Sequence, residues 1–482
     1  MSYTLVLEWM PGDLYMSAVT ARCTAPTSSY SVVWLPPNKV YQITLYCGST
    51  SLVSFLVGAF RGKAWSYMSN ISERHMSNIS ERQKDILSII RGLDISPTLY
   101  KNAVEKYQAL GHFLNDNGLE AEIYPQGSFA FGTVVRPSAK DSSASYDLDF
   151  ICQVTGTRDD YTPARLRDKV ETVLKSSNIY ADRLKIDDTC FTIEYADVGE
   201  IGFSIDVVPA TGESEKTKQR LVLKSAAPTL IDTSISIPKC GNERKFQWIT
   251  NNPKGLRKWF DDINAPFLAS SKKAERMRIF AENRALYESV EEIPDELERS
   301  ALQRVIQILK SHRNNYYASL KDGDEIKPIS AIINVAVTKI AEHFNPDCTV
   351  FELLNYVFSE LVIYGEHQHI TEKDFSQRYG VRTVFSRPAG KWYIENPANP
   401  EDNLADQWNI DARIPIKFFQ WIRVAQSDLI GSLEQKDNKQ FRAILESSFG
   451  SASVLGSLGE KYCGDVAPRQ IVSQTAARPY RV

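Results

Sequence analysis

Three aspartates within two apolar runs constrain this chain more than any other feature of its sequence. Asp147 and Asp149 lie one residue apart in the first run, and Asp206 lies in the second. Both runs are typical of β-strands, in which an uncompensated charge among apolar neighbours is costly. The pattern therefore predicts a β-sheet that brings these carboxylates together in one functional site.

Strand alternation predicts that Asp147 and Asp149 share one face of the sheet. Carboxylates held together repel one another, and a divalent cation relieves that repulsion. If the strand of Asp206 lies beside theirs, the three side chains can hold two Mg²⁺ ions, for which Mn²⁺ can substitute. We predict that all three are catalytic metal ligands, with Asp206 nearest an attacking hydroxyl whose proton it can accept.

A small polar turn, Gln126-Gly127-Ser128, precedes the first aspartate pair. Glycine lets the backbone approach a phosphate closely, and helix-start amides bind anions together with a serine hydroxyl. Such turns are common, but ahead of an Asp-x-Asp strand the turn becomes specific for nucleotidyl transfer. Thr133 and Arg136 follow, and for them phosphate contact and a solvated loop are equal alternatives.

Composition excludes some classes of protein. A chain of 482 residues is long enough for two or three domains, and its net charge of −3 argues against a broad nucleic-acid-binding surface. The longest apolar stretch, residues 52–60, is too short to span a bilayer, which takes about 20 residues. Seven scattered cysteines without a CxxC pair are typical of reduced thiols, so we expect a cytoplasmic protein without a membrane anchor.

The N-terminal segment differs from the rest of the chain. Residues 1–67 carry six charged side chains and three strand-like runs, at 3–9, 30–35 and 40–46. Residues 68–74 recur verbatim as 76–82, which is typical of a cloning junction. We interpret 1–67 as an appended β-rich segment, either a small domain or sequence foreign to the enzyme, and 68–83 as a duplicated junction.

Helix and strand signals alternate from residue 84 to 264 and are mostly helical beyond it. A spine helix starts at Ser96-Pro97, where a capping residue precedes proline, and Gly118 is its expected stop. Expected strands are 121–124, 146–154, 190–195 and 201–208, with a helix over 162–176. Later helices are expected at 272–288, 295–317, 328–345, 349–363, 404–427 and 434–449. These patterns predict a core domain over 84–264, a helical domain over 265–450 and a flexible tail over 451–482.

The ordered motifs resemble those of the DNA-polymerase-β-like nucleotidyltransferases. The wider segments 125–137, 147–150 and 205–210 are similar to the bacterial cGAS/DncV-like nucleotidyltransferases (CD-NTases), and the similarity covers most of 84–450. The resemblance implies an α+β fold, in which a polymerase-β-like mixed sheet with helices packs against a C-terminal helical domain like that of oligoadenylate synthetases. It also implies a bilobal shape with a central active-site cleft.

The same resemblance implies an activity and its partners. CD-NTases of this kind, including the SMODS-type synthases, make cyclic di- or trinucleotide second messengers from nucleoside triphosphates such as ATP, release pyrophosphate, and act in anti-phage defence (CBASS). Accessory and effector proteins of that system are the implied partners, in the bacterial cytoplasm. In this family a lysine and a serine from the helical half reach the triphosphate, a role that the resemblance gives to Lys310 and Ser330. From the residues alone they are a solvated lysine and a helix-start serine.

One further segment, Asn396–Leu404, resembles an Asn-Pro-rich stretch of the same family. We interpret it as structural, with Asx turns and a cap for the helix that follows. The metal-binding thumb of the animal DNA sensor has no counterpart in the sequence, so direct activation by long DNA loses support.

Two alternatives to a cyclic oligonucleotide synthase remain at this stage. One is a linear oligonucleotide synthase or an enzyme that nucleotidylates RNA or protein. The other is a catalytically silent nucleotide-binding scaffold. Three intact carboxylates favour an enzyme, because a silent scaffold has no use for a costly acidic cluster.

Overall fold

The computed structural model describes most of the chain beyond residue 62 and part of what precedes it. The described residues are 4–7, 19–22, 41–47, 50–57, 63–95, 97–135, 145–198, 201–224, 227–241, 245–282 and 298–463. Within these ranges side chains are described from residue 76 onward, apart from 97–99, 145–147, 196–198, 201–203 and 273–282. The chain divides into two compact units, Met1–Ser80 and Glu81–Val482.

The described residues of the first unit form four strands and the beginning of a long helix. The elements are β1 (Thr4–Leu7), β2 (Val19–Arg22), β3 (Tyr41–Cys47), β4 (Thr50–Val57) and α1 (Lys63–Gly92). β1 pairs with β2 and β3 with β4, both antiparallel. The strands predicted at 3–9 and 40–46 correspond to β1 and β3, whereas the one predicted at 30–35 lies outside the described residues.

Helix α1 passes through both copies of the repeated segment and continues into the second unit. Arg82, in the second copy, is buried, and its guanidinium donates to the carbonyl of Leu433 at 3.0 Å and to Asn438 Oδ1 at 3.0 Å. The same guanidinium lies 4.4 Å from the centre of the Phe441 ring. Arg82, the last residue of the second copy, is therefore packed within the second unit.

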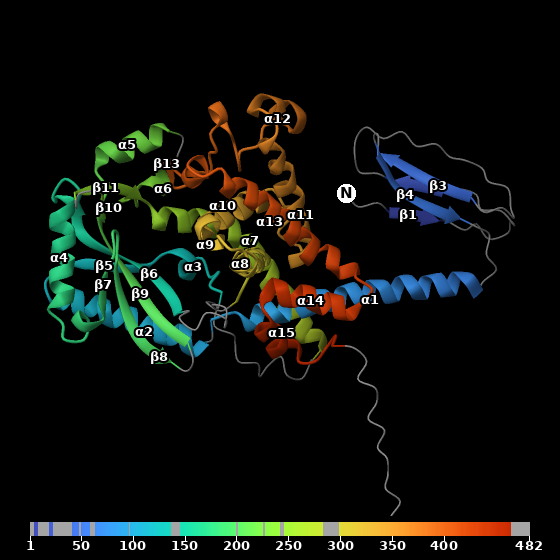
Figure 1. Cartoon of the computed structure of the whole chain (residues 1–482), viewed down its shortest axis with the longest axis horizontal. Coiled ribbons are helices and arrows are strands. Elements are labelled where there is room, and N and C mark those ends of the chain that lie inside the picture. The colour runs from blue at the N-terminus through green and yellow to red at the C-terminus, as the bar shows by residue number, and fades with distance from the viewer. Residues whose placement is uncertain are drawn as a thin grey trace, which may run out of the picture. The chain divides into compact units, whose positions relative to one another are not determined.

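A seven-stranded mixed sheet forms the first half of the second unit (Figure 1). Its strands are β5 (Ala121–Pro125), β6 (Ser145–Thr157), β7 (Leu184–Ile186), β8 (Phe191–Val198), β9 (Ile201–Gly212), β10 (Ile235–Cys240) and β11 (Phe246–Asn251). Their order is β11-β10-β9-β6-β5, with β8 paired to β9 and β7 to β8. β6 and β9 are parallel, and the other pairs are antiparallel. The four strands predicted for this region correspond to β5, β6, β8 and β9.

Two of the helices of this half begin at a side-chain cap, formed by Thr162 and by Ser214. The helices of this half are α2 (Pro97–Asp116), α3 (Gly127–Ala130), α4 (Pro163–Lys175), α5 (Glu215–Leu223) and α6 (Pro228–Ile231). At α4 the Thr162 hydroxyl accepts from the amide of Arg165 at 3.3 Å, directly before a proline at the first helical position. α4, β7 and β8 together form the crossover that the parallel pair β6–β9 requires.

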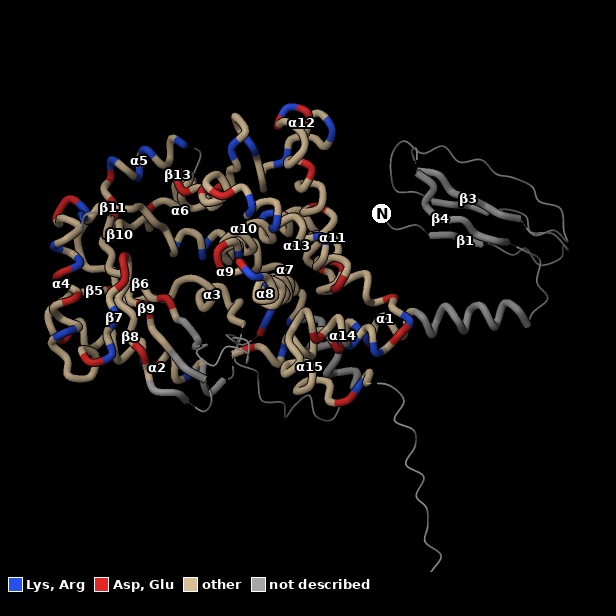
Figure 2. The backbone as a smooth tube through the Cα atoms, in the orientation of Figure 1, with Lys and Arg blue, Asp and Glu red and all other residues tan. Residues whose placement is uncertain are grey.

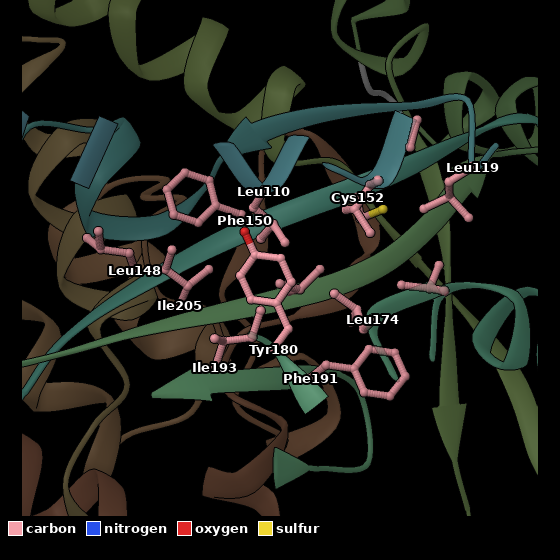
Figure 3. Close-up of a cluster of buried hydrophobic side chains, with 14 of the residues drawn as sticks. Leu110, Leu119, Leu148, Phe150, Cys152, Leu174, Tyr180, Phe191, Ile193 and Ile205 are labelled. Atoms are coloured by element: carbon pink, nitrogen blue, oxygen red, sulfur yellow. The ribbon is translucent and has the colours of Figure 1, made fainter. Parts of the chain in front are cut away.

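Apolar side chains at every second position of β6 and β9 form the core beneath α2 and α4. Leu148, Phe150 and Ile205 are fully buried there with Leu110 of α2 and Leu174 of α4. Figure 3 shows these side chains gathered in one cluster. Because strand positions alternate, the aspartates between these residues belong to the opposite face of the sheet.

The second half of this unit is helical. Its elements are α7 (Pro253–Glu282), α8 (Ala301–Ala318), α9 (Gly323–Ile326), α10 (Ser330–Ala341), α11 (Val350–Tyr364), α12 (Glu372–Tyr379), β12 (Glu395–Asn396), β13 (Asn399–Asn403), α13 (Arg413–Leu429), α14 (Asn438–Phe449) and α15 (Ser451–Leu458). α8 is its central helix and packs against α7, α10, α11, α13 and α14. Buried side chains on all its sides are consistent with that position.

Three helix boundaries differ from the prediction for local reasons. α7 begins at Pro253 and not near 272, because Asn252 Oδ1 accepts from the amide of Gly255 at 3.0 Å and starts the helix there. α8 begins at Ala301 and not at 295, because Ser300 forms a capping box with Gln303. α13 begins nine residues later than the predicted 404.

The late start of α13 follows from the Asn-Pro-rich segment. The side-chain oxygens of Asn396, Asn399 and Asn403 each accept from the amide two residues further on, which confirms the predicted Asx turns. Asn403 Oδ1 also accepts from the amide of Ile394 at 3.0 Å. Side chains that bind the backbone in this way compete with helix formation, and the residue before α13, Ala412, makes no side-chain cap. The predicted helix-capping role is therefore wrong.

The beginning of the predicted tail has regular structure. Residues 451–458 form α15, and beyond it Lys461 Nζ lies 2.8 Å from both Asp85 Oδ2 and Glu81 Oε1. The Tyr462 hydroxyl also donates to Asp85 Oδ2, at 2.6 Å. Residues 464–482 lie outside the described part of the chain.

Basic and acidic residues are interspersed along α4 and α12 (Figure 2). Among the described residues, no helix is both long enough and apolar enough to cross a membrane. The five cysteines whose side chains are described, Cys152, Cys190, Cys240, Cys348 and Cys463, are free thiols.

Candidate active site

The parallel pair β6–β9 places two of the three predicted carboxylates opposite one another. Asp149 on β6 is the register partner of Asp206 on β9, and Asp147 is the register partner of Ser204. Neighbouring strands are about 4.8 Å apart, and register partners share a face of the sheet. The condition set by the sequence, that the strand of Asp206 lies beside that of the pair, is therefore met.

The described carboxylates lie on the face opposite the α2–α4 core. Ile151 and Val208, two residues beyond Asp149 and Asp206, are buried in a separate cluster on that face. The Asp147 side chain lies outside the described part of the structure. Among the described side chains, no three His, Cys, Asp or Glu form a metal-binding group, so the three-carboxylate site depends on Asp147 and stays a prediction.

Gly127 approaches the Asp149 carboxylate more closely than any other residue type could. Its φ is +61°, and a Cβ built at this position would lie 2.9 Å from Asp149 Oδ2. The amide of Gln126 donates to the carbonyl of Asp149 at 2.8 Å, which fixes the turn on β6. The Gly-Ser turn and the first aspartate strand are thus joined by a backbone hydrogen bond, a contact that the sequence analysis did not predict.

The predicted helix after this turn is a single turn, α3, of four residues. So short a helix has little macrodipole, so an anion-binding role for Gln126, Gly127 and Ser128 has to rest on individual donors. The carbonyl of Ser128 accepts from the amide of Thr133 at 2.9 Å, which closes the loop after α3. Phosphate binding by the three residues stays a prediction.

Thr133 is not part of a solvated loop, because it is fully buried. Its hydroxyl has no hydrogen-bond partner in the described part of the chain, which leaves a buried polar atom beside the site. The solvated-loop alternative is therefore wrong for Thr133, and Arg136 lies outside the described residues.

Two glutamines of α8 bind the loop that follows α3. Gln303 Nε2 donates to the carbonyl of Phe131 at 2.9 Å, and Gln307 Nε2 donates to the carbonyl of Val134 at 2.9 Å. Residues four apart lie on one side of a helix, so this side of α8 faces the loop. The helical half and the sheet half therefore meet at the Gly-Ser loop.

Lys310 continues the same side of α8. Its exposed fraction is 5%, and its ammonium group donates to the carbonyl of Thr133 at 2.9 Å. Burial, followed by the charge of Arg313, lowers the pKa of Lys310 to about 7, while Asp149 acts in the opposite direction. Lys310 is therefore buried against the Gly-Ser loop and is not the solvated lysine that the residues alone suggested. Its contact with a triphosphate stays a prediction.

Ser330, at the first position of α10, is reached from α8 by a residue that the sequence analysis did not select. Arg313 Nη1 donates to Ser330 Oγ at 3.1 Å and to the carbonyl of Pro328 at 2.9 Å, and Nη2 donates to Asn314 Oδ1 at 2.8 Å. Because Ser330 Oγ accepts from the guanidinium, its own hydrogen stays available for another acceptor. The signal in the sequence was the spacing of three residues between Lys310 and Arg313, which puts both on one helix face.

A half-buried thiol reports the negative charge around Asp206. Burial, and then the carboxylates of Asp206, Asp187 and Asp149, raise the pKa of Cys190 to about 11. Cys190 Sγ lies 4.0 Å from Asp187 Oδ2. Burial is the larger cause, and the carboxylates of Asp206, Asp187 and Asp149 add negative charge around this thiol.

The pKa of Lys310 gives a prediction about nucleotide affinity. In the free protein the ammonium charge is lost as the pH rises through about 7, so the attraction for a triphosphate falls above that pH. We expect the Kd for a nucleoside triphosphate to increase between pH 7 and pH 9 more steeply in the wild type than in Lys310→Met. Calorimetric titration with a non-hydrolysable triphosphate measures both curves.

Thermal stability provides the control, because we expect the contribution of Lys310 to stability to rise with pH while its contribution to nucleotide affinity falls. The pKa of Lys310 is about 7 in the folded protein, below the ordinary lysine value of 10.5, so between these values the unfolded chain binds more protons. The contribution of Lys310 to stability then rises with pH across this window. The Tm of the wild type minus the Tm of Lys310→Met should therefore increase from pH 7 to pH 10. Parallel Tm curves for the two proteins would show that Lys310 is charged throughout and would contradict the prediction.

Comparison with known proteins agrees with this geometry. Residues 121–208, which contain the Gly-Ser turn and all three aspartates, match the family model of the nucleotidyltransferase domain of DncV-like cyclic GMP-AMP synthases. Residues 121–208 therefore form a DncV-like nucleotidyltransferase domain. The predicted resemblance to the CD-NTases is confirmed.

Two relatives illustrate the extent of the similarity. A c-di-GMP synthase of Roseivirga ehrenbergii is 24% identical over 320 residues, which cover 65% of this chain and 70% of that protein. The structure of the Bradyrhizobium diazoefficiens CD-NTase CdnG in complex with GTP superposes with a TM-score of 0.53 at 20% identity, over 78% of this chain and 97% of that one. The second likeness shows the fold and confirms the predicted α+β architecture, whereas the predicted central cleft stays a prediction.

Proposed function

We propose that this nucleotidyltransferase makes a cyclic di- or trinucleotide from nucleoside triphosphates, ATP among them. The observation that carries the proposal is the register of Asp149 with Asp206 on adjacent parallel strands, with Gly127 against the Asp149 carboxylate. The similarity to a protein named c-di-GMP synthase supports a cyclic product, and a relative solved with GTP supports a nucleoside triphosphate as substrate.

The reaction joins nucleotides one at a time. The 3′- or 2′-hydroxyl oxygen of one nucleotide bonds to the α-phosphorus of another, the bond from that phosphorus to its bridging oxygen breaks, and pyrophosphate leaves. The hydroxyl gives up its proton, for which Asp206 is the proposed acceptor. A last transfer of the same kind, within one molecule, closes the ring.

The acidic cluster fits divalent cations by the chemistry of its donors. Asp149 and Asp206 offer carboxylate oxygens from facing positions, and Asp147 lies two residues before Asp149 on the same strand. We propose that these three residues hold two Mg²⁺ ions, or Mn²⁺ in their place. When bound, the ions supply charge neutralisation for the phosphates and lower the pKa of the attacking hydroxyl.

The remaining proposed contacts hold the triphosphate. Gln126, Gly127 and Ser128 contact it from the turn after β5, and Lys310 and Ser330 contact it from the helical half. Arg313 supports this arrangement, because its donation to Ser330 Oγ leaves the serine hydrogen for a phosphate oxygen. The sheet half and the helical half then bind one substrate from two sides.

We place the enzyme in the bacterial cytoplasm, within an anti-phage signalling system whose accessory and effector proteins are its partners. The proposed domain limits are 84–264 for the nucleotidyltransferase core and 265–450 for the helical domain, after the appended segment 1–67 and the junction 68–83. The limit between the two domains lies within α7, which begins in the proposed core and continues into the helical domain. Residues 451–482 follow, of which α15 occupies the first part.

The experiment that tests this proposal is incubation with all four nucleoside triphosphates and Mg²⁺ or Mn²⁺. The products are treated with phosphatase and analysed by mass spectrometry. A cyclic oligonucleotide is expected, because a ring has no terminal phosphate for the phosphatase to remove. Linear products alone would support the linear synthase, and binding of nucleotides without any product would support the scaffold.

A further inference from the structure

The strand next to Asp206 carries a hydroxyl that contacts its carboxylate. Thr192 on β8 is the register partner of Asp206 on β9, and its hydroxyl donates to Asp206 Oδ1 at 2.6 Å. The neighbours of Thr192 along the strand, Phe191 and Ile193, are fully buried in the core on the other face. Strand alternation therefore directs Thr192 to the face of the acidic cluster.

Two carboxylates lie within reach of this one hydroxyl hydrogen. Thr192 Oγ1 is 2.6 Å from Asp206 Oδ1 and 3.4 Å from Asp187 Oδ2. A hydroxyl donates a single hydrogen, and 2.6 Å is within the range of charge-assisted O–H···O⁻ hydrogen bonds. The donation therefore goes to Asp206, while Asp187 adds negative charge on the outer side.

We propose that Thr192 is a positioning residue for the Asp206 carboxylate. The terminal torsion of an aspartate is broad, so a carboxylate without a fixed contact rotates easily. The Thr192 hydroxyl holds Oδ1 and thereby restricts rotation of the carboxylate that would bind a divalent cation. This inference rests on the proposed function, in which Asp206 is a metal ligand.

Partners of this kind have a measurable effect on metal sites. Residues that hydrogen-bond to a metal ligand typically change metal affinity about 10- to 100-fold when they are replaced. Thr192 is suited to the role because its β-branched side chain has a restricted first torsion on a strand. Its hydroxyl is therefore held in place before any cation or substrate arrives.

The test compares Thr192→Val, which keeps the shape of the side chain and removes the hydroxyl, with Thr192→Ser, which keeps the hydroxyl. Mn²⁺ binding without nucleotide is measured by electron paramagnetic resonance, together with the Mg²⁺ concentration that gives half-maximal synthesis. We expect the Val variant to bind Mn²⁺ roughly 10- to 100-fold more weakly and to need correspondingly more Mg²⁺. The Ser variant should remain close to the wild type, and circular dichroism and Tm should show both folded.

Each other outcome is informative. Equal Mn²⁺ affinity of a folded Val variant and the wild type would overturn the role of Thr192. If the Val variant does not fold, Thr192→Ala replaces it, because Ala and Ser differ by the hydroxyl alone, and equal affinities of that pair would again overturn the role. The variant Asp206→Asn tests the proposed metal site separately from the role of Thr192. Unchanged Mn²⁺ binding in that variant would reject Asp206 as a metal ligand and with it the proposed function of the site.

Discussion

Replacing Asp149 and Asp206 together by Asn is expected to lower the rate of nucleotide joining by at least about 1000-fold. The two side chains are register partners on β6 and β9, so the double variant removes the facing carboxylates and keeps the shape of both side chains. A metal-dependent phosphoryl transfer loses several kcal/mol of charge stabilisation with its ligands, and about 1.36 kcal/mol corresponds to each factor of ten in rate.

The fold should survive this change. Asn is nearly isosteric with Asp, and neutral side chains no longer repel one another, so the Tm of the double variant should equal or exceed that of the wild type without metal. Initial rates are measured by pyrophosphate release. A matched control is Glu194→Gln, which removes one charge from an exposed residue of neighbouring β8 and should leave the rate within a few-fold of the wild type. Near wild-type activity of the double variant would show that Asp149 and Asp206 are not catalytic residues.

Gly127→Ala is the second change with a large expected effect. A Cβ at residue 127 would lie 2.9 Å from Asp149 Oδ2, closer than such atoms approach in proteins, so either the turn or the carboxylate has to move. Misplacing a catalytic group by about 1 Å can lower the rate roughly 100-fold. We expect a loss of that size in kcat, with a smaller change in Tm.

Gly118→Ala is the control for backbone strain. Gly118, at the end of α2, has a φ of +79°, and a Cβ there has no neighbour within 4 Å. Both variants therefore carry the strain of a positive φ, about 1–2 kcal/mol, but Gly127→Ala alone meets a carboxylate. Similar activity of the two variants would show that the approach of Gly127 to Asp149 has no role in the reaction.

The central strands and the carboxylate pair could be predicted because their signals are local. Alternation of Leu148 and Phe150 with Asp147 and Asp149 fixes both the strand and its faces, and β6 is found where that pattern predicts it. A turn at Gly127 was predictable from its local Gly-Ser signal, whereas its approach to the Asp149 carboxylate was not.

The contacts that complete the site could not be predicted, because they depend on which elements become neighbours. Thr192 gains its place through the register of β8 with β9, and a single sequence does not state that register. Lysine is normally found at the surface, but Lys310 is buried because α8 is the central helix of its half. The hydrogen bond from Arg313 on α8 to Ser330 on α10 depends on how these two helices pack, which local helix propensity does not determine.

The ratio of pyrophosphate released to nucleoside triphosphate consumed tests the central claim most directly. Each bond releases one pyrophosphate, and a ring has as many bonds as nucleotides, so a cyclic synthase gives one pyrophosphate for each nucleotide consumed. A linear dinucleotide gives half that amount, because one triphosphate remains in the product. We predict a ratio of one with a free, phosphatase-resistant product that is absent from the Asp149→Asn, Asp206→Asn variant. A ratio of one half with a phosphatase-sensitive product, or no release of pyrophosphate at all, would contradict the assignment.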